Sequence, residues 1–179
     1  METTKQKLKK VYENLKGEFG YKSVMSAPKL EKIVVSVGTG SKIKIDKNKN
    51  TFIADRLARI TGQKAREMQA KKSIASFKLR QGEQIGVMVT LRGDRMYAFF
   101  DKLINIALPR TKDFRGLDAK ALDGIGNLTI GIKEHTIFPE TGDEELKDVF
   151  GLAITFVTTA KTKEEAKALF DYLGIPFKK

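Results

Sequence analysis

Apolar residues recur at helical spacing in four stretches of the chain, and this pattern predicts four helices. In the first stretch Leu8, Val11, Leu15 and Phe19 fall on one face. Capping residues, glycine and proline give the expected ends of the helices. For the four predicted helices in order, the start and end signals are Thr4 and Gly20, the 46–50 segment and Gly62, Asp94 and Pro109, and the Thr162–Glu165 capping box and Gly174.

Alternating apolar and more polar residues predict strands between these helices. The clearest run lies at 84–92, where Ile85, Val87, Val89 and Leu91 alternate with Gly, Met, Thr and Arg. Further strands are expected at 30–37, 64–69, 128–133 and 152–159.

The resulting order, α-β-α-β-β-α-β-β-α, is typical of an α+β fold with an antiparallel or mixed sheet. Each predicted helix has one apolar stripe, so the helices are expected to pack on one face of the sheet and to leave the other face open. A chain of 179 residues with 41% hydrophobic residues can form one sizeable core. We therefore expect a single domain over 1–179, with a basic loop at 70–82 and an acidic loop at 140–148.

Positive charge is concentrated in the first half of the chain, whose formal net charge is +12 over its whole length. Residues 1–80 hold 20 Lys and Arg against 7 Asp and Glu, whereas residues 116–179 hold 8 against 11. A cationic surface attracts polyanions because neutralised phosphates release their counterions. The first half is therefore expected to bind nucleic acid through its loops and the open sheet face, and the acidic part to contact a basic protein.

The strongest local signal is the stretch 71–80, which reads K-K-S-I-A-S-F-K-L-R. Four cations, two hydroxyls and Phe77 occur there with neither helical spacing nor strict alternation, so an exposed loop is predicted. A run of charge is often only a solvated face. An aromatic residue among cations can stack on a base or a sugar, although Phe77 could equally anchor the loop to the core.

Other kinds of chemistry find little support in the sequence. The turn V-G-T-G-S-K-I at 37–43 lacks the third glycine of a dinucleotide-binding turn and the Lys-Ser/Thr pair of a P-loop. His135 is expected on the surface or in a hydrogen bond, without catalytic partners. With no cysteine, no signal-peptide core and no apolar run of about 18 residues, a cytoplasmic protein with no cofactor, metal or membrane contact is expected.

Nine short motifs, taken together, carry a resemblance to a known family. They read L-E-K-I-V at 30–34, I-T-G-Q-K at 60–64, A-K-K-S-I at 70–74, F-K-L-R at 77–80, I-A-L-P-R at 106–110, D-F-R-G-L at 113–117, I-F-P-E at 137–140, V-T-T-A at 157–160 and G-I-P-F-K-K at 174–179. Together they resemble the bacterial form of large-subunit ribosomal protein five, the 5S rRNA-binding protein of the central protuberance. The likeness runs from about Leu8 to the C-terminus and implies a scaffold, not an enzyme.

The resemblance implies three sets of contact residues. Those expected at 5S rRNA are Ser36, Gln63 and Thr90, with Lys32, Lys64 and Arg92 as phosphate contacts. Those expected at P-site tRNA are Lys71, Lys72, Ser73, Phe77, Lys78 and Arg80. Those expected at a basic small-subunit head protein, as an intersubunit bridge, are Glu140, Asp143, Glu144 and Glu145. Large-subunit rRNA and other central-protuberance proteins are further implied partners.

The chain departs from the family pattern at three positions. Ser36 stands where bacterial members usually carry Asn, so an amide with a donor and an acceptor is replaced by one hydroxyl. Ile125, in D-G-I-G-N at 123–127, replaces the usual Arg and removes a cation. Ser76 replaces a common Gly or Asn in the basic loop.

Two other functions remain open from the residues alone. One is a general RNA chaperone or single-strand-binding module, which the basic first half would also suit. The other is a nucleotide-dependent enzyme that uses the turn at 38–40.

Overall fold

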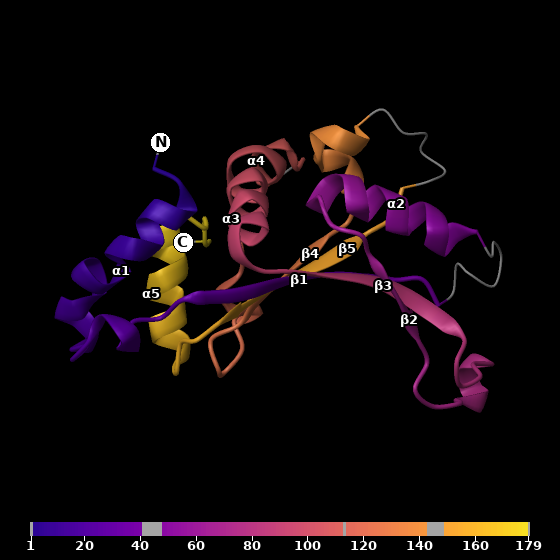
Figure 1. Cartoon of the computed structure of the whole chain (residues 1–179), viewed down its shortest axis with the longest axis horizontal. Helices are drawn as coiled ribbons and strands as arrows, with labels where there is room; N and C mark the ends of the chain where they lie inside the picture. Colours follow the sequence, from indigo (N-terminus) through magenta and orange to yellow (C-terminus); the bar gives the residue numbers. More distant parts are fainter. Residues whose placement is uncertain (1, 41–47, 113, 143–148, 179) are drawn as a thin grey trace. The chain divides into compact units, whose positions relative to one another are not determined.

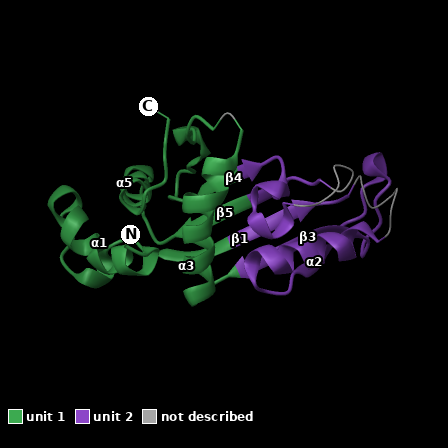
Figure 2. Cartoon of the chain, turned by 90° about the horizontal axis from the view of Figure 1, so that it is seen from above, with its two compact units in different colours: residues 1–33, 91–130, 154–179 green, residues 34–90, 131–153 purple. Residues whose placement is uncertain are grey.

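The structure is a computed structural model, and it describes residues 2–40, 48–112, 114–142 and 149–178. The chain divides into two compact units, coloured green and purple in Figure 2. Unit 1 comprises Met1–Ile33, Leu91–Ile130 and Ile154–Lys179, and unit 2 comprises Val34–Thr90 and Gly131–Ala153.

The strands form one five-stranded antiparallel sheet with the order β2-β3-β1-β5-β4. On the edge strand β2, Arg66 lies opposite Met88 of β3, and the register shifts between Met68 and Gln69. The α+β prediction is therefore confirmed. The strands are β1 Leu30–Gly38, β2 Arg66–Gln69, β3 Gln84–Leu91, β4 Leu128–Ile132 and β5 Leu152–Thr158.

The strands β1, β3, β4 and β5 bury alternate side chains over most of their length, as the alternation in the sequence predicts, whereas the edge strand β2 buries none. In β1, Val35 and Val37 are buried, whereas Val34 and Ser36 are half-buried. The same alternation continues in β3 and β5. The side chains of the buried face are Ile33, Val35, Val37, Val87, Val89, Leu91, Leu128, Ile130, Ile132, Leu152, Ile154 and Phe156.

The helices occur in the predicted order along the chain, which the colours of Figure 1 follow. Gly20 and Gly62 end α1 and α2 with φ of 62° and 68°, a left-handed conformation that glycine adopts without a steric penalty. The helices are α1 Thr4–Phe19, α2 Lys49–Thr61, α3 Gly93–Lys102, a π-helical segment η3 Leu103–Ala107, α4 Leu108–Arg110 and α5 Lys163–Leu173. Short 3-10 helices are η1 Val24–Ser26, η2 Ala75–Phe77, η4 Ala119–Ala121, η5 His135–Ile137 and η6 Pro139–Thr141.

Phe156 of β5 is a centre of packing in unit 1. The ring of Phe100, from α3, meets it edge-on with the ring centroids 5.5 Å apart. Phe170, from α5, meets it with the centroids 6.0 Å apart. All three rings are fully buried. Because both helices contact the same side chain, α3 and α5 cover the same face of β5.

In unit 2 the helix α2 supplies the apolar side chains that the pattern predicts. Ile53, Leu57 and Ile60 are buried, and Figure 1 shows α2 above the strands β2 and β3. Asn50 of α2 also donates from Nδ2 to Oε1 of Gln84 in β3, at 3.2 Å. One helix face is thus directed at the sheet.

The predicted cap at Thr4 is wrong, because Thr3 is the N-cap of α1. Gln6 returns to this residue and accepts from its backbone N–H at 3.0 Å. Thr4 is instead buried, and its hydroxyl donates to Oδ1 of Asp101 in α3 at 2.5 Å. The Thr4 side chain, which the local sequence pattern predicts as a helix cap, therefore makes a tertiary hydrogen bond.

The predicted cap at Asp94 is also wrong. Arg92 is the N-cap of α3, and Asp94 lies within the first turn. Its carboxylate accepts from Nζ of Lys5 at 2.7 Å. A carboxylate in the first turn still interacts favourably with the positive end of the helix dipole.

The helix that follows β3 does not end at Pro109, as predicted, but at Arg110. Proline has no N–H and clashes with the carbonyl four residues before it in an α-helix. Here the preceding turn is π-helical, and Leu108 N donates to Leu103 O, five residues earlier. The wider turn accommodates the proline, so the chain remains helical for one more residue.

The capping box predicted at the start of α5 is half present. Thr162 Oγ1 accepts from Glu165 N at 3.2 Å, but the Glu165 carboxylate does not accept a hydrogen bond from Thr162 N in turn. It accepts from Lys161 N at 2.7 Å and from the hydroxyl of Tyr21 at 2.6 Å. Burial, together with this hydrogen bond to a carboxylate, raises the pKa of Tyr21 above its ordinary value.

Candidate nucleic-acid interface

Two predicted 5S rRNA contacts, Ser36 and Thr90, lie on the face of the unit 2 strands opposite the buried side chains, here named the open face. Both side chains are half-buried, on the neighbouring strands β1 and β3. Neither hydroxyl hydrogen-bonds to another side chain or to backbone within the described parts of the chain. A hydroxyl is one donor and can accept two hydrogen bonds. These two groups are therefore placed to bond to a ligand on this face.

Gln63 follows the end of α2, and the structure brings it to Thr90. Gln63 Nε2 donates to the backbone oxygen of Thr90 at 3.0 Å, and Thr61 Oγ1 donates to Gln63 O at 3.2 Å. The amide is thus held at the edge of the open face with one N–H used. Its Oε1 has no hydrogen-bond donor among the described residues. Lys64, the next residue, is exposed and has no acidic partner there either.

In unit 1, the two predicted phosphate contacts Lys32 and Arg92 share a carboxylate. Glu31 Oε1 lies 3.3 Å from Arg92 Nη1 and 3.9 Å from Lys32 Nζ. The three side chains are between 31% and 58% exposed, so solvent screens these ion pairs. The prediction from sequence did not include Glu31, although it is adjacent to Lys32. Its charge reduces the positive potential at both cations.

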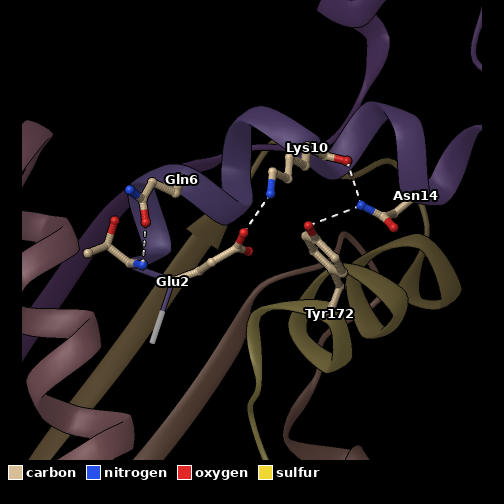
Figure 3. A network of polar contacts seen from close by, with 6 residues as sticks. Glu2, Gln6, Lys10, Asn14 and Tyr172 are labelled. Carbon is tan, nitrogen blue, oxygen red and sulfur yellow. Dashed lines mark hydrogen bonds and ion pairs between the residues drawn. The ribbon is translucent and has the colours of Figure 1, made fainter.

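Three of the lysines on α1, which belong to the cationic first half of the chain, have polar partners within unit 1. Lys5 pairs with Asp94, and Lys7 donates to the backbone oxygen of Leu173 at 3.0 Å. Lys10 pairs with Glu2 at 2.5 Å, and Figure 3 shows this pair beside α5. The hydrogen bond and the opposite charge raise the pKa of Lys10 and lower that of Glu2.

Asn14 completes the network of Figure 3 and ties α1 to α5. Its Nδ2 donates to Lys10 O at 2.9 Å and to the hydroxyl of Tyr172 at 3.1 Å. The lysine-rich helix therefore has a structural role in unit 1.

The basic loop of unit 2 is exposed, as predicted. Every side chain from 71 to 78 is exposed, and Phe77 in η2 is 68% exposed. The interpretation of Phe77 as a core anchor is therefore wrong. Lys71, Lys72, Lys78 and Arg80 have no ion pair within the described residues. Ser73, also a predicted tRNA contact, accepts a hydrogen bond from Gln81 N at 3.0 Å.

Of the predicted intersubunit residues, only Glu140 lies within the described parts of the chain. It is exposed in η6. Asp143, Glu144 and Glu145 lie outside the described residues.

The turn that contains Ile125 is held by a carboxylate of unit 1. Asp123 Oδ1 accepts from Ile125 N at 3.1 Å and from Asn127 N at 2.6 Å. Desolvation by the neighbouring chain on its own would raise the pKa of the exposed Asp123, but the hydrogen bonds from Asn127 and Ile125 outweigh it and lower the pKa below its ordinary value. The Ile125 side chain is 68% exposed.

Of the two alternatives predicted for His135, on the surface or in a hydrogen bond, the structure shows the second, because the side chain is buried and hydrogen-bonded. Its ring stacks on Phe150 with the centroids 3.9 Å apart, and Nδ1 accepts from Phe150 N at 3.3 Å. Phe150 also accepts through its backbone oxygen from His135 N at 3.1 Å. This histidine therefore fastens η5 to the segment before β5.

The described residues contain no group of three or more His, Cys, Asp or Glu that could hold a metal ion. No helix among them is long and apolar enough to span a bilayer. In the 38–40 turn, Thr39 is buried and its N–H donates to Ile85 O at 2.9 Å, while 41–43 lie outside the described residues.

Comparison with known proteins identifies the family. Residues 23–80 match the family model described as "Ribosomal protein L5", and residues 84–177 match the model described as the C-terminus of the same ribosomal family. The chain belongs to the ribosomal protein L5 family. It is 52% identical to the large ribosomal subunit protein uL5 of Desulforamulus reducens, over 96% of this chain and 94% of that protein.

Two further relatives have the same description, large ribosomal subunit protein uL5. The one from Geobacter sulfurreducens is 52% identical over 95% of this chain and 94% of the relative. The one from Heliobacterium modesticaldum is 54% identical over 89% and 88%. The L5 family consists of structural ribosomal proteins, so this member is an rRNA-binding constituent of the ribosome. The alternative of a nucleotide-dependent enzyme is wrong.

Proposed function

We propose that this chain binds 5S rRNA and anchors it in the central protuberance of the large ribosomal subunit, in the cytoplasm. The observation that carries the proposal is the pair of hydroxyls of Ser36 and Thr90, half-buried on the open face of unit 2 without intramolecular side-chain partners. Gln63 lies beside them and Lys64 follows it. Polar groups on a sheet face, bordered by cations, suit an RNA strand whose bases and 2′-hydroxyls are accessible.

The proposed 5S rRNA contacts have two roles. Ser36, Gln63 and Thr90 supply neutral hydrogen-bonding groups, which can distinguish bases and riboses. Lys32, Lys64 and Arg92 supply charge, which makes affinity depend on salt. Large-subunit rRNA and neighbouring central-protuberance proteins are proposed as further partners.

A filter-binding salt titration with 5S rRNA tests this proposal. Ser36→Ala combined with Thr90→Ala removes two hydrogen bonds of about 1 kcal/mol each, so affinity should fall about 10- to 30-fold at unchanged salt slope. Thr51→Ala is the matched control, because Thr51 is an exposed hydroxyl of α2 in the same unit. Equal affinity for 5S rRNA and an unstructured RNA would instead support a general RNA chaperone.

We propose further that the basic loop contacts P-site tRNA through Lys71, Lys72, Ser73, Phe77, Lys78 and Arg80. The support is its four exposed cations and the exposed Phe77 ring. Lys71→Glu combined with Lys72→Glu should speed the release of tRNA from the P site and leave 5S rRNA binding within about twofold, since the charge reversal is confined to the loop. Loss of 5S rRNA binding by the folded variant would contradict the separation of the two sites.

The acidic loop at 140–148 is proposed to meet a basic protein of the small-subunit head through Glu140, Asp143, Glu144 and Glu145. The proposal rests on the excess of acidic residues in the last part of the chain. Surfaces of opposite charge favour association and correct register.

A further inference from the structure

The basic loop with its flanking residues, 70–83, is here named the finger. Backbone hydrogen bonds join its two sides at two places, the base and the tip. At its base, Ala70 N donates to Glu83 O at 2.8 Å and Gly82 N donates to Ala70 O at 3.0 Å. Near its tip, Ile74 and Leu79 exchange both backbone hydrogen bonds, at 2.9 and 3.1 Å. The finger therefore continues the pairing of β2 and β3 beyond the sheet.

Between the base and the tip of the finger the backbone pairing is interrupted. Within the described residues, 71–73 make no backbone–backbone hydrogen bond across the finger. Gln81 N has no backbone acceptor there, and it donates instead to Ser73 Oγ at 3.0 Å. The serine hydroxyl thus occupies the place of a missing carbonyl and links the two sides of the finger.

The tip is closed by a turn that fixes where its cations lie. Lys78 N donates to Ala75 O at 2.9 Å, and Lys78 has a left-handed backbone with φ of 49°. Lys71 and Lys72 directly precede Ser73 on one side of the finger, and Arg80 directly precedes Gln81 on the other side. All of these side chains are exposed. The position of each cation therefore depends on the link that joins the two sides.

We propose that Ser73, beyond any contact of its own with tRNA, is a positioning residue: its hydroxyl keeps the finger in one conformation before tRNA binds. This rests on the proposed tRNA contact of the finger. A ligand that meets an ordered loop does not have to order it, and the entropy cost of binding is smaller. The finger is thus a preformed platform for a phosphate backbone.

Two measurements on the full-length protein test this role. The first is hydrogen exchange of the Gln81 amide in the free protein, and the second is the rate of tRNA release from the P site of ribosomes that carry the variant. Ser73→Ala should speed Gln81 exchange by up to about tenfold, the factor that corresponds to one intramolecular hydrogen bond. It should also speed tRNA release by about two- to tenfold.

Two companion variants make the test specific. Ser73→Thr keeps the hydroxyl and should restore both rates. Ser76→Ala is the matched control, because Ser76 is an exposed hydroxyl of η2 in the same finger and makes no hydrogen bond there among the described residues. It should change neither rate.

The outcomes separate this inference from the proposed function. Faster tRNA release in Ser73→Ala with unchanged Gln81 exchange would mean that Ser73 acts on tRNA by direct contact alone, and would overturn the positioning role. Faster Gln81 exchange with unchanged tRNA release would overturn it as well. If Lys71→Glu with Lys72→Glu leaves tRNA release unchanged, the proposed tRNA contact of the finger itself has failed.

Discussion

At the scale of single residues, the carboxylate of Asp123 in unit 1 holds the turn at 123–127 by accepting several hydrogen bonds. Asp123 accepts hydrogen bonds from Ile125 N and from both the backbone and the side chain of Asn127. Asn127 Oδ1 in turn accepts from Thr158 N at 3.2 Å. One carboxylate thereby orients the residue that ties the turn to the end of β5.

The lowered pKa of Asp123 predicts a stability that depends on pH. Because the folded-state pKa lies below the unfolded one, the stabilisation is present above about pH 4 and is lost as the pH falls through the folded value. Asp123→Asn should lower the melting temperature at pH 7 and reduce its decline between about pH 5 and pH 3. Thermal melts across this range check the effect. Asp171→Asn, at an exposed carboxylate of α5, serves as the control and should keep the full decline.

Glu31 gives a second prediction at the scale of one residue. Glu31→Gln removes the negative charge beside Lys32 and Arg92, so 5S rRNA affinity should rise about two- to fivefold at low salt, with the gain shrinking as salt screens it. Filter binding at several salt concentrations measures this. Glu13→Gln removes the same charge from an exposed position of α1. An equal gain in that variant would show a general effect of net charge and contradict a local one.

At the scale of elements, the approach of β3 to β1 depends on a residue without a side chain. A Cβ at Gly86 would lie 2.7 Å from Val37 O, closer than real Cβ atoms come to another atom. Gly131, on β4 in the same unit, has nothing within 4 Å of the corresponding point. The first glycine is required by packing, whereas the second is not.

Gly86→Ala should therefore destabilise the protein by about 1–3 kcal/mol, because a strand or a carbonyl has to move to admit the methyl group. Gly131→Ala should change the stability by less than about 1 kcal/mol. Urea denaturation with a common slope compares the two variants. Similar losses in both would mean that flexibility of the glycines, and not the contact with Val37, sets their contribution.

At the scale of the whole molecule, four strands contribute residues to both compact units, namely β1, β3, β4 and β5. We propose on this ground that the chain is a single cooperative domain. Calorimetry should give one unfolding transition, with equal calorimetric and van't Hoff enthalpies. Gly86→Ala should shift that transition as a whole, by about 2–4 °C for each kcal/mol. Two transitions, with only one moved by the substitution, would contradict a single domain.

The candidate site shows where prediction from sequence reaches its limit. The residues expected to touch RNA were chosen by motif; those on β1 and β3 are half-buried, whereas those in the finger are exposed. Glu31 and Gln81 were missed. Glu31 was visible as an acid next to Lys32, but no sequence pattern signals that a backbone N–H such as that of Gln81 lacks a carbonyl partner.

The sequence by itself determined the order of helices and strands, the buried face of the sheet, the glycine ends of α1 and α2, and the family. These follow from periodicity and from local backbone preferences, which act over a few residues. Only the tertiary structure decided that Thr4 bonds to Asp101, that Glu165 bonds to Tyr21, and that Ser73 links the finger. The first two contacts join groups distant in the chain, and the third joins the two sides of a loop; a pattern of neighbouring residues carries no information about which of these groups meet once the chain has folded.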